Sequence, residues 1–279
     1  MTAVSQEHYA QCEELLRARD RDLWLACLFM PPDARKHIHA LYAFAQEAAD
    51  VSGKVTQPLL GEMRLQWWVD ALEGAAAPGE GARANPLADA LIDTIERFAL
   101  PRKAFIALAE AHIFDLYDDR MPSWSALKDY CRATSSAPMR WAACILGADL
   151  EGPSARALDE AGVALGLTRI ARAIAERPGQ QKFLPDEAFA TDGAPNAGRK
   201  ELRLALEEMR TLAQSHYDEA RRLALNLGAA RAALLPAATI PLYLERLARS
   251  DYDSRRPPDE PSPLRRQWRI WRASRGVGM

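Results

Sequence analysis

Cysteine, valine and long apolar runs are scarce in this chain of 279 residues. Its four cysteines form no C-x-x-C pair and match no zinc spacing, which favours reduced thiols in a cytosolic setting. There are only six valines, and no run alternates polar with β-branched or aromatic residues, so strands are not expected. No stretch approaches the roughly 18 apolar residues of a membrane span, and the start lacks the basic and apolar regions of a signal peptide. We therefore expect neither secretion nor a transmembrane segment.

The chain also lacks an excess of either positive or negative charge. Lys and Arg total 36 against 38 Asp and Glu, which gives a formal charge of −2. A chain so balanced is not an electrostatic binder of nucleic acid as a whole. Because 48% of the residues are hydrophobic, the chain can bury a large core, and we expect a folded cytoplasmic protein.

Apolar residues recur with a helical period along most of the chain, which predicts an all-α fold. The clearest faces are Ile38, Leu41, Tyr42 and Ala45; Leu65, Trp68, Val69 and Leu72; Phe105, Leu108, Ala109 and His112; and Ile240, Tyr243, Leu244 and Leu247. Proline and glycine breakers separate these helices, with loops expected at 74–86 and 190–199. No break is polar or long enough to be a linker. We expect one helical domain over 1–254 and a separate tail over 255–279.

The tail is basic and rich in tryptophan. Seven arginines stand against two acids between residues 255 and 275, a local balance of +5. Leu264, Trp268 and Trp271 share a helical face, which is typical of a basic amphipathic helix. Two interpretations stay open: the tryptophans pack on the protein body, or the helix contacts an acidic surface. The predicted surface or membrane contacts are Arg265, Arg266, Trp268, Arg269, Trp271 and Arg272.

The chain has no H-E-x-x-H, P-loop or G-x-G-x-x-G motif. His37 and His39 are two apart and so point to different helix faces, which makes them poor joint metal ligands. In a helical bundle, acids three or four residues apart can hold Mg²⁺ against a diphosphate. Glu47 with Asp50 and Asp89 with Asp93 have this spacing, as do acids in the segment DLYDD at 115–119. The alternative interpretation of each acidic pair is an ordinary solvated helix face or helix-end turn.

Four segments resemble the squalene/phytoene synthase family. They are residues 20–72, with the helices ALYAFAQEAAD and RLQWWVDAL; LKDYCRATSSAPMRWAACILG at 127–147; GLTRIARAIAERPGQQKFLPDEAF at 166–189; and LLPAATIPLYLERLAR at 234–249. The resemblance covers most of the chain, from about residue 20 to 250. It implies the all-α isoprenoid synthase bundle with a central cavity and Mg²⁺-dependent head-to-head condensation of two prenyl diphosphates.

Both metal-binding motifs that the resemblance implies are damaged. The first, D-D-x-x-D, aligns with residues 49–53, where Asp50 is the one acid left and the residual metal candidate. The second, N-x-x-R-D-x-x-x-D, aligns with residues 169–177, where Arg172 survives and Ala173 and Arg177 replace both acids. A neutral or cationic wall repels Mg²⁺, so we expect no cofactor unless the chain is a transferase.

The resemblance implies ligand contacts in the cavity from Arg35, Tyr42, Glu47, Asp50, Arg169 and Arg172. Two roles stay open for the arginines. A guanidinium fork suits phosphate oxygens, so Arg169 and Arg172 could hold an anion between them. Alternatively, they are solvated or paired, Arg172 with Glu176 one turn away.

The segments YAFAQE and PLLGEMRLQWW and the altered second motif resemble the non-carotenogenic branch of the family, which includes a mitochondrial complex I assembly factor. This resemblance implies a non-catalytic assembly or interaction factor with a partner in respiratory-complex assembly, binding an isoprenoid or phosphate ligand at most. It also implies a cytoplasmic location, peripheral to the inner face of the cell membrane. The alternative is a prenyl-diphosphate transferase that works with a reduced metal set.

Overall fold

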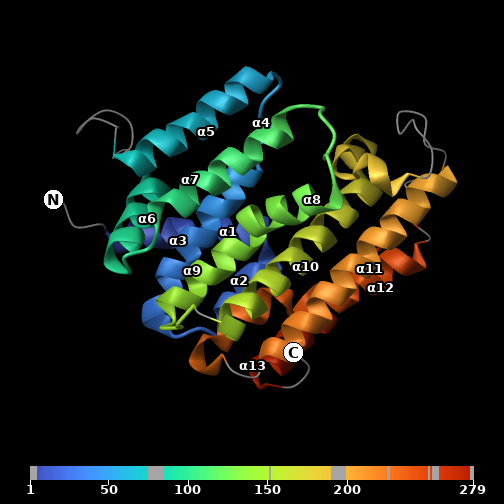
Figure 1. Ribbon diagram of the computed structural model, residues 1–279. Coiled ribbons are helices and arrows are strands. Elements are labelled where there is room, and N and C mark those ends of the chain that lie inside the picture. Colours follow the sequence, from blue (N-terminus) through green and yellow to red (C-terminus); the bar gives the residue numbers. More distant parts are fainter. Residues whose placement is uncertain are drawn as a thin grey trace. The chain divides into compact units, whose positions relative to one another are not determined.

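Helices make up all the regular secondary structure in the described part of a computed structural model of the chain (Figure 1). The structure describes residues 5–74, 85–150, 152–189, 199–224, 227–250, 252 and 258–276. No strand occurs in these ranges, so the all-α prediction is confirmed. The loop predicted at 190–199 lies outside the described residues except for Arg199, as do residues 75–84 of the other loop and residues 255–257 of the tail.

The described residues form two compact units. The first contains residues 1–117, 137–150 and 227–235, and the second contains residues 118–136, 151–226 and 236–279. The helix η8 (Gly228–Thr239) passes from one to the other. The helices of the first unit are α1 (Gln6–Arg19), α2 (Arg21–Cys27), α3 (Pro32–Ala49), α4 (Val51–Lys54), α5 (Pro58–Glu73), α6 (Pro86–Arg97), α7 (Arg102–Ala111), η2 (His112–Leu116) and α9 (Ala137–Ile145).

The core of the first unit is built around α3, which packs against α1, α6 and α9. All four predicted apolar faces in the chain are buried, three of them in this unit. Phe44 meets Trp68 edge to face, and Phe105 stacks on Trp141 with ring centroids 3.6 Å apart. These aromatic contacts hold α3 against α5 and α7 against α9. Glu47 lies in the last turn of α3, and Asp50 caps its end.

Prolines mark the beginnings of several helices, as the breaker pattern predicts. α3, α5, α6, α12 and α13 each carry a proline in the first turn, where its missing N–H breaks no helical bond. At α6 the Asn85 side chain also caps the helix by accepting from the backbone N–H groups of Leu87 and Ala88. Pro236 differs, because it lies within the 3₁₀ segment η8 and the following α-helix begins only at Ile240.

The second unit centres on two long helices. Its elements are α8 (Trp124–Cys131), η3 (Arg132–Ser136), α10 (Gly152–Glu176), η4 (Pro178–Phe183), η5 (Asp186–Ala188), α11 (Arg199–Leu223), α12 (Ile240–Arg249) and α13 (Pro263–Ser274). α10 and α11 pack side by side over much of their length (Figure 1).

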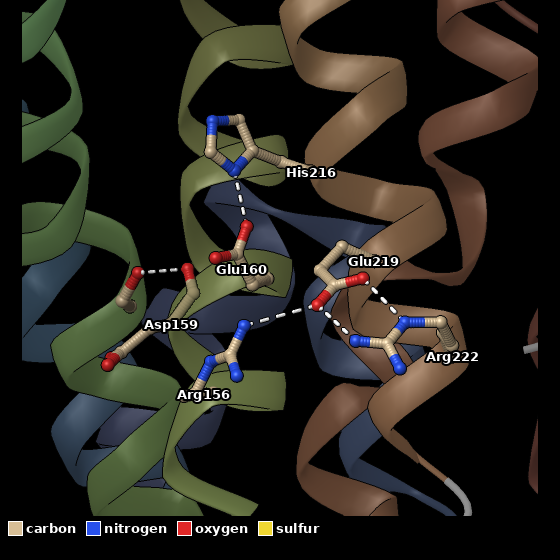
Figure 2. A network of polar contacts seen from close by, with 7 residues as sticks. Arg156, Asp159, Glu160, His216, Glu219 and Arg222 are labelled. Carbon is tan, nitrogen blue, oxygen red and sulfur yellow. Dashed lines mark hydrogen bonds and ion pairs between the residues drawn. The ribbon is translucent and has the colours of Figure 1, made fainter. Parts of the chain in front are cut away.

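A polar network ties α10 to α11 (Figure 2). Glu219 on α11 accepts two hydrogen bonds of 2.7 Å from Arg222 and one of 3.2 Å from Arg156 on α10. One turn away, His216 bonds to Glu160. These partly exposed pairs fix the register of α11 along α10, and buried apolar residues such as Leu206 supply most of the contact.

Two glycines let α10 approach the preceding segment closely. A Cβ on Gly162 would lie 2.2 Å from the Cα of Ser136, and one on Gly166 would lie 2.7 Å from the Cys131 sulfur. Ser136 ends η3, a π-helical turn between α8 and α9, and its hydroxyl donates to the Asp159 carbonyl at 2.8 Å. The sequence gives no sign of this π-turn, which widens the helix where α10 crosses it.

We expect Gly162→Ala to destabilise the protein by about 1–3 kcal/mol or more, because the added methyl collides with backbone that cannot move aside. The matched control is Gly53→Ala in α4, where a Cβ meets nothing within 4 Å. That variant should keep or slightly raise the free energy of unfolding, since alanine is the better helix former. Urea unfolding measures both, and equal stabilities would show that the close contact is absent.

Candidate functional site

Two carboxylates at the end of α3 are neutralised by cations of the same unit. Glu47 and Asp50 are three residues apart, so they lie on one side of the helix end. Arg19, the last residue of α1, contacts both: its Nη1 lies 2.5 Å from Glu47 Oε2 and its Nε lies 3.2 Å from Asp50 Oδ2. Lys54, which ends α4, donates to both Glu47 oxygens at 3.0 Å. Two positive and two negative charges therefore balance within one cluster, named here the Arg19 cluster.

The Arg19 cluster sets the protonation of Glu47. Burial alone would raise the pKa of this carboxyl, but the hydrogen bonds from Lys54 and Arg19 outweigh burial and hold its pKa below the usual value. Glu47 is therefore an ionised carboxylate at neutral pH, stabilised by its own neighbours. Such a group is a poor general base, because its proton affinity is reduced.

A groove of about 610 Å³ lies beside this cluster in the first unit. Glu47 and Lys54 contribute to its wall, and α5 contributes most of its apolar surface. The lining side chains are Glu47, Val51, Lys54, Val55, Thr56, Leu60, Met63, Arg64, Trp67, Trp68 and Asn85. Of the predicted ligand contacts, Glu47 is the one that lines this groove.

Other candidates on α3 serve the packing of that helix. Arg35 donates from Nη2 to the carbonyls of Leu28 and Met30 at 2.8 and 2.9 Å, which satisfies the chain end after α2. Tyr42 is 4% exposed in the core. The two histidines are also buried, and burial lowers the pKa of each to about 4, so both are neutral at pH 7. His37 bonds to Thr94 and Tyr9, whereas His39 lies 3.8 Å from Glu13, so they share no common ligand.

The other acid pairs are also engaged locally. Asp93 accepts a hydrogen bond of 2.5 Å from the Tyr9 hydroxyl, and Asp89 lies 3.7 Å from His8. In the DLYDD segment, Asp115 pairs with His112 at 2.7 Å. The contacts of Asp93 and Asp89 hold α6 against α1, and the contact of Asp115 closes the turn η2 that follows α7.

In the second unit, Arg172 is enclosed by protein groups. Its guanidinium carbon lies 3.9 Å from the centroid of the Tyr243 ring, and its Nη2 pairs with Glu260. Glu260 also lies 3.4 Å from Arg266 on α13 and accepts from the Tyr243 hydroxyl at 3.4 Å. Glu176, the partner expected from helical spacing, is only at the 4.0 Å limit. The main counter-ion of Arg172 is therefore Glu260, which follows it by 88 residues.

The remaining positions of the second motif supply no carboxylate. Arg169 is half-buried, Ala173 has no ligand atom, and Arg177 is exposed. Because Arg172 is already paired with Glu260 and stacked on Tyr243, an anion held between Arg169 and Arg172 would have to displace that carboxylate. The geometry favours the paired interpretation of Arg172 over the phosphate-binding one.

The donor set does not fit the magnesium ions that the resemblance implies. Mg²⁺ requires carboxylate oxygens that are not already neutralised by fixed cations. Arg19 and Lys54 neutralise Glu47 and Asp50, and Ala173 and Arg177 stand where the resemblance implies the acids of the second motif. Within the described ranges, no group of three or more His, Cys, Asp and Glu side chains is placed to hold a metal ion.

The predicted contact residues of the tail separate into two sets. Arg266 and Arg269 point into their own unit, where Arg266 donates to the Tyr243 hydroxyl at 3.2 Å and Arg269 donates to the Ala238 carbonyl at 3.0 Å. They therefore anchor α13 and do not serve as outward contacts. Arg265, Trp268, Trp271 and Arg272 are exposed, and the two tryptophan side chains are 59% and 40% accessible.

Four residues that complete these clusters carry no sequence signal. They are Arg19, Lys54, Tyr243 and Glu260. Arg19 and Lys54 meet Glu47, and Tyr243 and Glu260 meet Arg172, at sequence separations that the three- or four-residue spacing of helical neighbours does not predict. Tyr243 was expected only as a core residue of its helix.

The described residues have an all-helical fold of the terpenoid synthase type, in which Glu47 pairs with Arg19 and Arg172 pairs with Glu260. The family model for squalene/phytoene synthase matches residues 16–272, and the chain belongs to that family.

Relatives of two kinds are similar over nearly the whole chain. Human "NADH dehydrogenase (ubiquinone) complex I, assembly factor 6" is 27% identical over 254 residues, which cover 90% of this chain and 73% of that protein. The phytoene synthase of Thermus thermophilus is 28% identical over 268 residues, covering 91% of this chain and 88% of the relative. The predicted family and the likeness to the complex I assembly factor are thus confirmed.

Solved structures confirm the predicted isoprenoid synthase fold. A dehydrosqualene synthase in complex with ligand superposes with a TM-score of 0.76 at 17% identity, covering 97% of this chain and 96% of the other. Squalene synthase HpnC from Alicyclobacillus acidocaldarius gives a TM-score of 0.69 at 23% identity, covering 89% and 95%. At these identities the likeness shows the fold alone.

We expect Arg19→Gln to lower the free energy of unfolding by about 1–2 kcal/mol at pH 7, between the values for exposed and buried ion pairs. The folded pKa of Glu47 is below its ordinary value of 4.5, so its contribution is full above that value and is lost as the pH falls through the folded pKa. The variant and the parent should therefore converge in acid. Arg21→Gln, an exposed residue two positions away, is the control and should cost little. A constant difference at all pH values would contradict the ionic account.

Proposed function

We propose that the chain is a non-catalytic member of the squalene/phytoene synthase family that acts in the assembly of a respiratory complex. The observation that carries this proposal is the Arg19 cluster, in which Asp50, the one acid left in the first motif, and the neighbouring Glu47 are already neutralised. Two bound diphosphates bring several negative charges that bridging metal ions must neutralise as one leaves. With Ala173 and Arg177 in the second motif, the chain lacks the carboxylates for that task.

The similarity to complex I assembly factor 6 supports the assembly part of the proposal, since it extends over 90% of the chain. An assembly factor needs surfaces rather than a metal centre, and the family fold supplies a rigid helical body. Any isoprenoid ligand that the protein retains needs apolar walls more than metal. The groove along α5, with Leu60, Met63 and Trp67 in its lining, supplies such walls.

The alternative is a prenyl-diphosphate transferase, and the similarity to phytoene synthase over 91% of the chain favours it. This function would require the Arg19 cluster to open and release Glu47 and Asp50 to metal. The transferase requires bound magnesium and the assembly factor does not, so a test of magnesium dependence distinguishes the two functions.

Calorimetric titration with farnesyl diphosphate should show no binding component that depends on magnesium, because the part of the chain that the structure describes offers no group of acidic side chains placed to bridge metal and diphosphate. Incubation of the protein with farnesyl diphosphate and magnesium should yield no head-to-head condensation product. The Thermus thermophilus phytoene synthase, assayed with geranylgeranyl diphosphate, is the positive control. Formation of dehydrosqualene or of a C30 cyclopropyl diphosphate from farnesyl diphosphate would contradict the proposal and establish the transferase.

Deletion of the gene in its source organism should lower NADH:quinone reductase activity of the membranes, since a complex that is not assembled does not turn over. The parent gene and an Asp50→Asn variant should both restore the activity, because the proposed function gives Asp50 a contact with Arg19 and no part in catalysis. The Gly162→Ala variant, expected to be unstable, is the negative control. Failure of Asp50→Asn at normal protein levels would contradict a non-catalytic role.

A further inference from the structure

The C-terminal helix α13 has one face fixed on the second unit. Ile270 and Ala273 are 1% and 4% exposed. Arg266 and Arg269 bond inward to Tyr243 and Ala238. These four positions recur at intervals of three or four, so they form one continuous helical face. The opposite face is thereby held outward in a fixed orientation.

That outward face carries large apolar side chains. Leu264, Trp268 and Trp271 are 77%, 59% and 40% exposed. The indole rings of the two tryptophans stack with centroids 4.8 Å apart, which makes one continuous apolar surface. Exposed tryptophans in such a stripe are costly to leave in water and mark an interaction surface.

Positive charge surrounds the stripe. Arg265, Arg272 and Arg275 are exposed, and the Arg275 guanidinium lies 5.5 Å from the centroid of the Trp271 ring. α13 itself contains no Asp or Glu. Glu260, just before the helix, is directed to Arg172 and Arg266. The charge of this face is therefore complementary to an anionic surface.

We propose that this outward face of α13 binds the surface of an anionic lipid bilayer. Tryptophan rings prefer the boundary between headgroups and acyl chains, and arginines beside them can pair with lipid phosphates. A single helix lying in the plane of the interface with a short apolar stripe and flanking cations fits this mode. Along the described helices none is long and apolar enough to cross a membrane, so the contact made by α13 is superficial.

Point variants of α13 test the proposal better than removal of the tail, because residues 258–276 also contain the inward anchors Arg266 and Arg269. Two double variants change only the outward face: Trp268→Ser with Trp271→Ser, and Arg265→Gln with Arg272→Gln. The matched control is Lys200→Gln with Arg203→Gln on α11, which removes two exposed cations elsewhere in the same unit. Melting temperatures should stay close to that of the parent for the α13 variants.

The full-length protein should co-sediment with vesicles of equal parts phosphatidylcholine and phosphatidylglycerol, and not with phosphatidylcholine alone. The fraction bound should fall as salt rises, because the attraction acts within a Debye length of about 8 Å at physiological ionic strength. Each α13 double variant should weaken vesicle affinity about tenfold or more, whereas the α11 control should bind as the parent does.

Several results would overturn the proposal. Equal binding of the α13 variants and the parent would place the contact elsewhere on the protein. Absence of binding to the anionic vesicles would leave another protein as the occupant of this face. Binding to phosphatidylcholine alone with the same affinity would show that the arginines have no role.

Discussion

The contact of Arg19 with Glu47 and Asp50 is the interaction on which the chemistry of this protein depends. α3 ends with two carboxylates three residues apart, and like charges at that distance repel unless a cation lies between them. Arg19 arrives from the end of α1 and bridges them, while Lys54 completes the charge balance for Glu47. The same acids that could have held metal therefore hold helices together.

The second unit uses the same physical solution with different residues. Arg172 keeps the arginine of the family motif, yet it is stacked on Tyr243 and paired with Glu260. Arg266 joins this group from α13, so one cluster connects α10, α12 and the C-terminal helix. A guanidinium over an aromatic ring contributes about 0.5–2 kcal/mol, so the contact between Arg172 and Tyr243 stabilises the folded protein. Because Arg266 and Arg269 fix one face of α13 on the second unit, Trp268 and Trp271 on the opposite face remain exposed.

Sequence alone predicts much of this fold, because burial follows a local period. Faces such as Leu65, Trp68 and Leu72 are visible from spacing, and proline positions such as Pro86 predict where helices begin. The π-turn at 132–136 has no such pattern, since it depends on the close approach of Gly162. The residues that pair with the candidate site residues were not predictable either. Glu260 is 88 residues from Arg172, and only the folded chain shows that it, rather than Glu176, is the main counter-ion.

The measurement that tests the central claim most directly is side-chain carboxyl NMR of Glu47 and Asp50 during a pH titration, with and without millimolar magnesium. The account predicts that Glu47 titrates below its ordinary value in both conditions, because Lys54 and Arg19 stabilise its charged form. Magnesium should leave both resonances unchanged. A shift of the Glu47 and Asp50 resonances together on adding magnesium, at concentrations that leave other carboxylates unaffected, would contradict it and show that these acids still form a metal site.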